Sequence, residues 1–525
     1  MRATGSGSAQ DAPPTARPIE RMCCPLPEKT LTITGGHVVD GTGAPAREAD
    51  VLIRNGTIAE VGPSLRRPEG SEVVEAEGLV VAPGFIDCHT HYDRAITWEG
   101  IGRHCALQGI TTVVGGNCGG GDADMAAHLD AAEAAGPGVS YTCLVGLSSV
   151  RTRVKGPVDA APTSDELATM MRIVEEALDA GAVGVSWGPY GAAQFQGTEE
   201  VRALVAPAGR RGRVFATHRR NERGGAVAAT REALAIVAGT DARLIISHLK
   251  VIGPNGFPLL DEMLETIDAA RREGLPAWCD AYPYTGAATG LSTLLPEWAK
   301  EGGRTHAVLG DDTCRTRLLE EIQQGIADRC SAEDILCFAR HMDGVFGLSL
   351  AQVAESLSVS PAEAVVALVL ADPDARGGGA VYRNTMREDQ VQRILSLPYC
   401  CVGADSGVTP EEGRPLRGGH PRSFGAFARA LRWSREGRTV GLATVVRQCS
   451  GLPAEALGIH DRGTLVAGKV ADVVVFDPKP ISDRATYEEP VQYPAGIRDV
   501  LLAGEWMVRD GSYVGAGRGK VLRDW

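Results

Sequence analysis

The most constraining feature of this 525-residue chain is a repeated alternation of short apolar runs with helical stretches between residues 83 and 460. This alternation is typical of parallel β/α units. Eight apolar runs, recognised by how they end, lie at 83–91, 111–118, 140–146, 182–187, 213–218, 243–248, 276–283 and 399–406. Eight units close a TIM-type barrel, so the sequence predicts an α/β fold with a (β/α)8 barrel over residues 83–460.

Three further parts of the chain are predicted besides the barrel units. Residues 29–82 and 461–525 carry β-rich runs separated by Gly and Asn turns, and we expect them to form one small β-sandwich domain built from both termini. Residues 285–398 are too long for a loop and predict an inserted helical subdomain between strands seven and eight. Residues 1–28 are rich in Gly, Ala, Ser and Pro and predict a flexible tail.

The composition of the chain indicates which kind of molecule it binds. Lys and Arg total 53 against 66 for Asp and Glu, a net charge of −13, which gives no electrostatic reason to bind nucleic acid or an anionic membrane. No window approaches the roughly 18 apolar residues that span a bilayer. The 13 cysteines are irregularly spaced and indicate a reduced, cytoplasmic setting. We expect a small-molecule partner, and nothing in the sequence specifies an oligomeric state.

Polar residues with metal-ligand chemistry gather where the predicted strands end. The C-terminal strand ends of a (β/α)8 barrel converge on one mouth, and imidazole, thiolate and carboxylate together suit Zn²⁺. Any one of these residues alone would be interpreted as a hydrogen-bonded core or turn residue, but six at one end of five strands favour a metal centre. They are His89, His91, Cys118, His218, His248 and Asp405.

The remaining histidines outside the recognisable motifs are expected to have no ligand role. They lie in predicted turns, helices or the insertion: His37, His104, His128, His306, His341 and His460.

Several motifs resemble a known family. PGFIDCHTHYD and DRGTLVAGKVADVVVFD (461–477) resemble the amidohydrolase superfamily. A narrower set is similar to the D-aminoacylases, the N-acyl-D-amino-acid deacylases: GGNCG (115–119), THRRNE (217–222), ISHLKV (246–251), DAYPY (280–284), GADSG (403–407) and HPRSFGAFARAL (420–431).

The resemblance implies a role for each matching position. Cys118, His218 and His248 match the ligands of a tightly bound zinc ion. His89, His91 and Asp405 match a second, weaker metal site. The family's contacts to the substrate carboxylate match Lys250, Tyr282 and Arg422.

The ligand chemistry supports this arrangement. Many relatives bridge two metals with a carboxylated Lys on strand four, but strand four here ends in VGVSW and has no Lys, so Cys118 is the expected substitute. A thiolate offsets much of the charge of zinc, which favours one tight metal with a loose neighbour. We take Asp405 as the only carboxylate among the strand-end residues and expect it to act as general base, then general acid.

Three departures from the family pattern concern the substrate pocket. Leu147 stands where the family has a His after strand three, although Arg151, which the resemblance assigns to the substrate, is kept. Ala288 stands where the family commonly has a Ser that holds the substrate carboxylate. After strand four, SWGPYGAAQF places Trp187 and Tyr190 near the mouth.

The leading hypothesis is a zinc-dependent hydrolase of a linear N-acyl (amide) bond. Its substrate would be an N-acyl-D-amino acid or a related specialised N-acyl compound, with an amide and a carboxylate. One alternative is a cyclic amide hydrolase of the hydantoinase or dihydroorotase type, which the missing strand-four Lys disfavours. Another is a non-catalytic scaffold with the amidohydrolase fold, which the complete ligand set disfavours.

Overall fold

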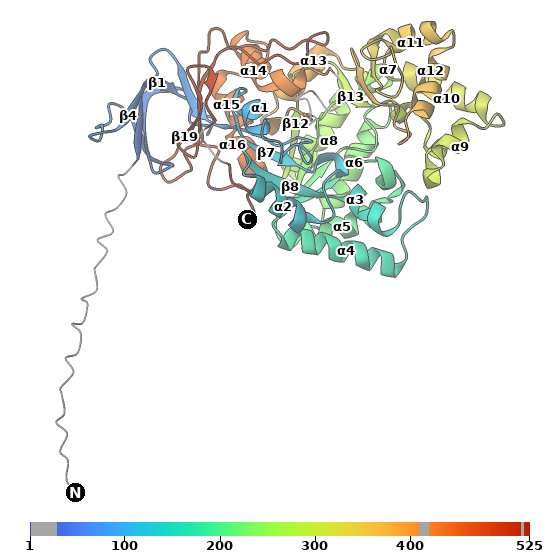
Figure 1. Ribbon diagram of the computed structural model, residues 1–525, viewed down its shortest axis with the longest axis horizontal. Coiled ribbons are helices and arrows are strands. Elements are labelled where there is room, and N and C mark those ends of the chain that lie inside the picture. The colour runs from blue at the N-terminus through green and yellow to red at the C-terminus, as the bar shows by residue number, and fades with distance from the viewer. Residues whose placement is uncertain (2–28, 409–418, 516–518, 525) are drawn as a thin grey trace.

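The structure is a computed structural model that describes residues 1, 29–408, 419–515 and 519–524 (Figure 1). The predicted flexible tail, residues 1–28, lies outside the described residues except for Met1.

Eight parallel strands form the central barrel, which confirms the predicted α/β barrel fold. The last strand lies beside the first: His91 N donates to Ser406 O at 2.6 Å, and Thr90 forms a parallel bridge to Ser406. In sheet order the strands are β6 (Phe85–Asp87), β7 (Ile110–Gly115), β8 (Ser140–Gly146), β9 (Gly184–Trp187), β10 (Val214–Thr217), β11 (Arg243–Ile246), β12 (Ala277–Ala281) and β16 (Cys400–Val402).

Helices follow the strands and cover the barrel. α4 (Ser164–Asp179) is representative: Thr163 and Glu166 form a capping box at its start, and it buries Met170, Val174 and Ala177 at helical spacing. The others are α1 (Ile101–Ala106), α2 (Met125–Ala135), α3 (Leu147–Val154), α5 (Thr198–Gly209), α6 (Ala226–Val237), α7 (Gly253–Gly256), α8 (Leu260–Arg272), α13 (Glu388–Leu395), α14 (Arg422–Arg435), α15 (Leu442–Cys449) and α16 (Gly451–Leu457).

Both ends of the chain contribute to one nine-stranded mixed sheet, which lies at the opposite end of the molecule from the insertion (Figure 1). The two halves join where β17 pairs antiparallel with β5. The strands are β1 (Thr30–Val38), β2 (Arg47–Arg54), β3 (Thr57–Gly62), β4 (Glu72–Glu75), β5 (Val80–Pro83), β17 (Val473–Phe476), β18 (Ile497–Leu502), β19 (Glu505–Arg509) and β20 (Ser512–Tyr513). The exact residue limits predicted for the separate units stay a prediction.

The segment between β12 and β16 forms its own hydrophobic cluster, which includes Leu318, Ile322 and Val365. Its helices before α13 are α9 (Thr305–Leu309), α10 (Arg315–Ala327), α11 (Leu350–Leu357) and α12 (Pro361–Ala371). It also contains an antiparallel sheet that was not predicted, with the order β13 (Ala287–Gly290), β15 (Gly379–Tyr382) and β14 (Ile335–Phe338).

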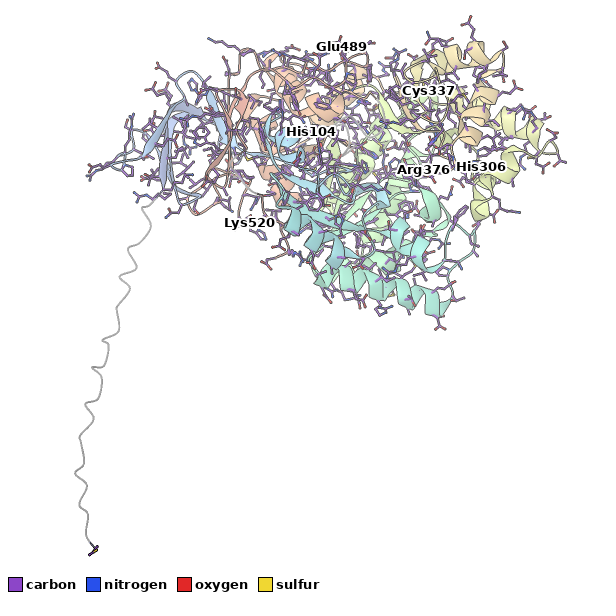
Figure 2. The ribbon with its side chains drawn as sticks, in the orientation of Figure 1. His104, His306, Cys337, Arg376, Glu489 and Lys520 are labelled. Atoms are coloured by element: carbon purple, nitrogen blue, oxygen red, sulfur yellow. The ribbon has the colours of Figure 1, made fainter. Side chains whose placement is uncertain are left out.

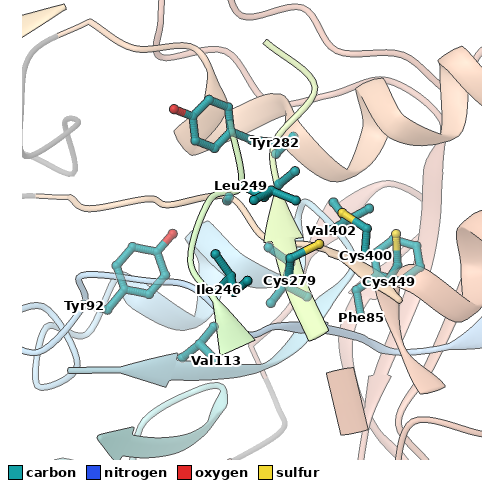
Figure 3. Packing of buried hydrophobic residues seen from close by; sticks show 14 of the residues in the cluster. Phe85, Tyr92, Val113, Ile246, Leu249, Cys279, Tyr282, Cys400, Val402 and Cys449 are labelled. Carbon is teal, nitrogen blue, oxygen red and sulfur yellow. The ribbon is translucent and has the colours of Figure 1, made fainter. Parts of the chain in front are cut away.

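Free cysteines are part of the barrel core. Cys279, Cys400 and Cys449 are buried among aliphatic and aromatic side chains such as Val402 and Phe85 (Figure 3). Every cysteine in the described part of the chain is free, and these three buried thiols pack as small hydrophobic groups.

Among the described helices, none is by itself long and apolar enough to cross a membrane. The bent pair of α11 and α12 passes that test on length and composition alone.

Candidate metal centre

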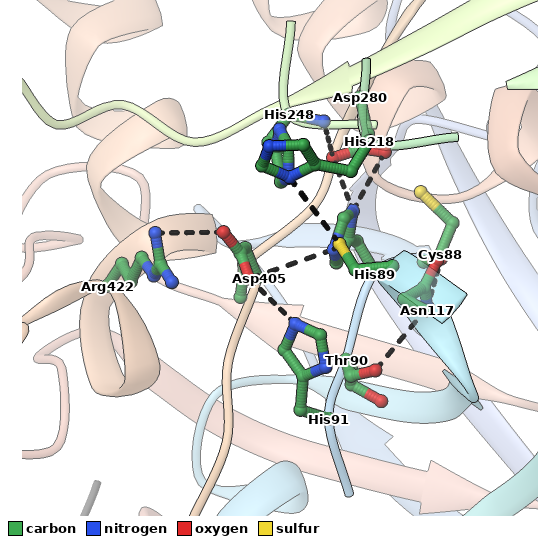
Figure 4. Close-up of polar contacts among 12 residues, drawn as sticks. Cys88, His89, Thr90, His91, Asn117, His218, His248, Asp280, Asp405 and Arg422 are labelled. Carbon is green, nitrogen blue, oxygen red and sulfur yellow. Dashed lines mark hydrogen bonds and ion pairs between the residues drawn. The ribbon is translucent and has the colours of Figure 1, made fainter. Parts of the chain in front are cut away.

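The six residues predicted as metal ligands meet in one cluster at the C-terminal ends of the barrel strands (Figure 4). The three that match the tight site are closest. His218 Nδ1 lies 2.7 Å from His248 Nε2, and Cys118 Sγ lies 3.5 Å from His248 Nε2 and 4.0 Å from His218 Nδ1. Two imidazoles and a thiolate that converge so closely form a donor set suited to Zn²⁺.

The other three predicted ligands form an adjoining group. Asp405 Oδ1 lies 3.1 Å from His91 Nε2 and 3.7 Å from His89 Nε2. Cys118 lies between the groups, with Sγ 3.4 Å from His89 Nε2. The thiolate therefore occupies the position that a shared ligand of two metals would need.

Three of these residues adopt left-handed backbone conformations. Cys118 has φ 54°, His248 has φ 36° and Asp405 has φ 47°. Such conformations cost about 1–3 kcal/mol for residues other than glycine and persist where the surrounding structure enforces them, often at functional sites. The barrel thus keeps three sharp turns that direct donor atoms into the mouth.

Asp280, at the end of β12, supports the cluster and was not predicted. Its Oδ1 lies 3.0 Å from His89 Nδ1 and accepts a hydrogen bond of 2.8 Å from the backbone N of His248. The expectation that Asp405 is the only carboxylate at a strand end is therefore wrong. Asp280 stands within the quoted DAYPY motif, and a carboxylate at a barrel strand end was the signal that could have identified it.

Glu222, four residues after His218, is the second supporting carboxylate that the sequence analysis missed. Its Oε1 lies 3.2 Å from His248 Nδ1 and 2.9 Å from Lys250 Nζ. Asp280 and Glu222 thus each face the Nδ1 atom of one ligand histidine. At His89, Asp280 can hold the tautomer in which Nε2 presents its lone pair to a metal. At His248, Nδ1 lies between the Glu222 carboxylate and the Lys250 ammonium.

The charges of the cluster favour its anionic members. Burial raises the pKa of the Cys118 thiol, but His89 and His248 outweigh burial, and the pKa lies well below its ordinary value. Burial likewise raises the pKa of Asp405, yet Arg422 and His89 hold it well below the ordinary range. Both shifts favour the ionised forms, which are the forms that bind a metal.

The residues predicted to contact a substrate carboxylate lie around the same cavity. Arg422 Nη1 lies 2.9 Å from Asp405 Oδ2, and its guanidinium stacks 4.5 Å from the centre of the Tyr282 ring. Lys250 Nζ lies 2.6 Å from His248 Nδ1. All three line the cavity.

Two of the departures from the family pattern also line this cavity. Tyr190 OH lies 2.9 Å from His218 Nε2, so this side chain touches a predicted zinc ligand directly. Ala288 lies on β13 and forms part of the cavity wall. Trp187 is instead buried, with its Nε1 donating to Gln196.

Arg151 lies elsewhere, contrary to the expectation that it contacts the substrate. It is fully buried in α3, where Nη1 lies 2.6 Å from Glu200 and Nη2 donates to the carbonyls of Val158 and Ala160. It is absent from the described cavity lining. The buried ion pair accounts for this arginine as a packing residue, because an unpaired buried charge would be costly.

Histidines that were assigned no ligand role lie away from the cluster. His104 packs beside Tyr92 in the barrel, and His306 lies in α9 against the carbonyl of Asp372 (Figure 2). His128 differs from the other histidines of this set because its surroundings resemble a cation site. It lies near Asp93 and Cys143 in an arrangement that could hold a cation, although its Nε2 already contacts Tyr141 OH at 2.8 Å.

The inserted segment builds one wall of the cavity. Ala288, Thr293, Lys300, Arg329 and Tyr382 all come from it and line the same space as Cys118 and Asp405. The insertion therefore shapes the part of the pocket that lies away from the metal cluster.

Comparison with known proteins places the chain among metal-dependent hydrolases. A model described as "Amidohydrolase family" matches residues 72–315 and 372–508. A D-aminoacylase of Alcaligenes xylosoxydans xylosoxydans is 33% identical over 518 residues, which is 94% of this chain and 97% of the relative.

Solved structures similar to this chain belong to the same group of enzymes. An N-acyl-D-glutamate deacylase from Bordetella bronchiseptica, complexed with zinc and a phosphonate that mimics the tetrahedral intermediate, has a TM-score of 0.80 and 33% identity. The match covers 94% of this chain and 99% of that one. A D-aminoacylase described as having a binuclear metal centre has a TM-score of 0.79 and 32% identity, with the same coverage.

Proposed function

Because this chain belongs to the amidohydrolase family, in its D-aminoacylase branch, we propose that it is a zinc-dependent hydrolase that removes the acyl group from N-acyl-D-amino acids. The observation that carries the proposal is the cluster in which Cys118 Sγ lies within 4.0 Å of nitrogen atoms of His89, His218 and His248. The D-amino-acid part of the proposed substrate is inferred from the substrates named for the related deacylases.

The donor set supports one metal held more tightly than the other. Cys118, His218 and His248 would hold the first, and His89, His91 and Asp405 would hold a second, weaker one. Zinc bound there supplies a Lewis acid that polarises an amide carbonyl and lowers the pKa of water.

Asp405 is the proposed proton carrier. Arg422 and His91 contact its carboxylate and favour its ionised form, so it can accept a proton from the attacking water. Water adds its oxygen to the amide carbon, the C–N bond breaks, and the carboxyl group of Asp405 returns the proton to the departing amine nitrogen. The products are a carboxylate and a free amine.

The α-carboxylate of the substrate would contact Lys250, Arg422 and Tyr282. Lys250 and Arg422 each already contact a carboxylate of the protein, Glu222 and Asp405 respectively. A substrate carboxylate would add to these contacts, and a planar guanidinium can serve two carboxylates at once.

The test is amine release by the zinc-loaded protein. N-acetyl-D-amino acids should be hydrolysed faster than their L enantiomers, and hydantoin and dihydrouracil should not be opened. A preference for the cyclic amides would favour the hydantoinase-type alternative. A protein that retains no metal and hydrolyses neither class would favour the scaffold alternative.

A further inference from the structure

Three cationic side chains in the cavity have no part in the proposed reaction. Arg223 follows β10, and Lys300 and Arg329 come from the inserted segment. All three line the same cavity as Cys118 and Asp405. Segments far apart in the sequence thus bring positive charge to one wall.

Every other cation of this cavity lies within 4.0 Å of a carboxylate. Arg219 and Lys250 approach Glu222, Arg422 approaches Asp405, and Arg220 lies 3.0 Å from Glu232. Among the described residues, Arg223, Lys300 and Arg329 have no carboxylate oxygen within this distance. The wall therefore carries three cations without a direct ion pair, although Asp328 and Glu222 act on Arg223 and Glu297 acts on Lys300 from a greater distance.

The positions of these groups are restrained. Arg329 Nη2 donates to Thr293 O at 2.8 Å and Nη1 to Gly325 O at 3.2 Å, and its guanidinium lies 5.5 Å from the centre of the Tyr382 ring. Both acceptors are backbone carbonyls, so the guanidinium is oriented without losing its net charge. An oriented guanidinium is suited to bidentate binding of a carboxylate.

The three cations also influence one another. Burial, together with Arg329 and Arg223, lowers the pKa of Lys300 to about 8 against the opposing effect of Glu297. Burial lowers the pKa of Arg223 as well, with Arg329 the next cause. Like charges held together in a partly desolvated wall are unfavourable until an anion joins them.

We propose that Arg223, Lys300 and Arg329 bind a second carboxylate of the substrate, so that the preferred substrates are dianionic N-acyl amino acids. This inference rests on the proposed function, in which Lys250 and Arg422 take the first carboxylate. The second carboxylate belongs either to an acidic amino-acid side chain or to a dicarboxylic acyl group, and the same cations would recognise both.

The test compares charged substrates with uncharged isosteres on the zinc-loaded enzyme. One pair is N-acetyl-D-glutamate and N-acetyl-D-glutamine, and the other is N-succinyl-D-leucine and its N-succinamoyl analogue. The charged member of at least one pair should have a kcat/KM about tenfold higher or more. The pair that shows the preference identifies which end of the substrate carries the second charge.

Variants test whether this preference depends on the three cations Arg223, Lys300 and Arg329. Lys300→Met and Arg329→Gln should bring the ratio within that pair toward one, because kcat/KM should fall more for the charged member than for the uncharged one. Lys300→Arg keeps the charge and should keep the ratio. Arg304→Gln changes an exposed cation of the same segment and serves as the matched control. A ratio near one in the unmodified enzyme for both pairs, or equal losses for both members in the variants, would overturn the proposal.

A failure of the proposed function itself would give a different result. If no N-acyl amino acid is hydrolysed, the second-carboxylate site can still be tested by calorimetry. This experiment measures the binding of N-acetyl-D-glutamate and N-acetyl-D-glutamine to the zinc-loaded protein. Tighter binding of the charged compound that is lost in Lys300→Met supports the second-carboxylate site. Equal binding of the two compounds overturns it.

Discussion

His89 Nδ1 lies 3.0 Å from Asp280 Oδ1, and both side chains are buried. A carboxylate in this position accepts the Nδ1 proton, so His89 Nε2 keeps its lone pair, which faces Cys118 and Asp405. Asp280 Oδ1 also accepts from the backbone N of His248. One carboxylate thus orients residues of both ligand groups.

Replacing Asp280 should therefore weaken metal binding. Asp280→Ala removes the acceptor for His89 Nδ1, and we expect zinc affinity to fall about 10- to 100-fold. Competition with a chromophoric chelator measures this loss. Asp374→Ala, at an exposed aspartate, should bind zinc like the unmodified protein. Unchanged zinc affinity in Asp280→Ala would contradict the orienting role.

Asp405→Asn should separate catalysis from metal content. The amide has the same shape but cannot accept the proton from water, so we expect kcat to fall by a factor of about 10²–10⁴. Zinc in the tight site should stay, because Cys118, His218 and His248 are untouched. Amine release and metal analysis on one preparation measure both effects. Full activity in this variant would show that another group moves the proton.

Ala288→Ser should improve binding of the substrate α-carboxylate. Ala288 lines the cavity, and a hydroxyl there would add a hydrogen bond to a charged group, a contribution of about 1.5–3 kcal/mol. KM should fall about tenfold or more, with kcat little changed, since the contact forms equally in the ground state and the transition state. Ala288→Val adds bulk without a donor and should not lower KM. An unchanged KM in the Ser variant would mean that the carboxylate lies elsewhere.

His104 should make the stability of the fold depend on pH. Burial lowers the pKa of His104 from 6.5 to about 3, so between these values the unfolded chain takes up a proton that the folded chain does not. The free energy of unfolding should therefore fall below pH 6.5, by about 2 kcal/mol at pH 5. Urea unfolding at pH 7.5 and pH 5 measures this.

His104→Gln should lose this part of the pH dependence, because glutamine does not titrate and can still pair with Tyr92 OH. The exposed His460→Gln is the control and should keep the slope of the unmodified protein. Identical slopes in His104→Gln and the unmodified chain would contradict the assignment.

The barrel and its ligand cluster could be predicted because both depend on local patterns. Strand and helix periodicities are set by neighbouring residues, and eight such units close a barrel. Once that fold is inferred, residues at strand ends such as His218 and His248 must share one mouth. The residue types then indicate zinc without any knowledge of side-chain contacts.

The supporting contacts could not be predicted in this way. Arg151 follows a motif that suggested the substrate pocket, yet it lies against Glu200, 49 positions later. Glu222 and Asp280 stood in motifs that the sequence analysis quoted, but their role depends on which imidazole nitrogen they face. That orientation depends on packing between strands, which local sequence patterns do not encode.

The sequence by itself determined the barrel, the donor set and the family, since these follow from periodicity, residue chemistry and motif spacing. Only the tertiary structure decided that Cys118 lies between two ligand groups and that Asp280 and Glu222 face His89 and His248. It also decided that Arg223 shares a wall with Lys300 and Arg329. The physical reason is that charges act through space, and the insertion brings groups together that are far apart along the chain.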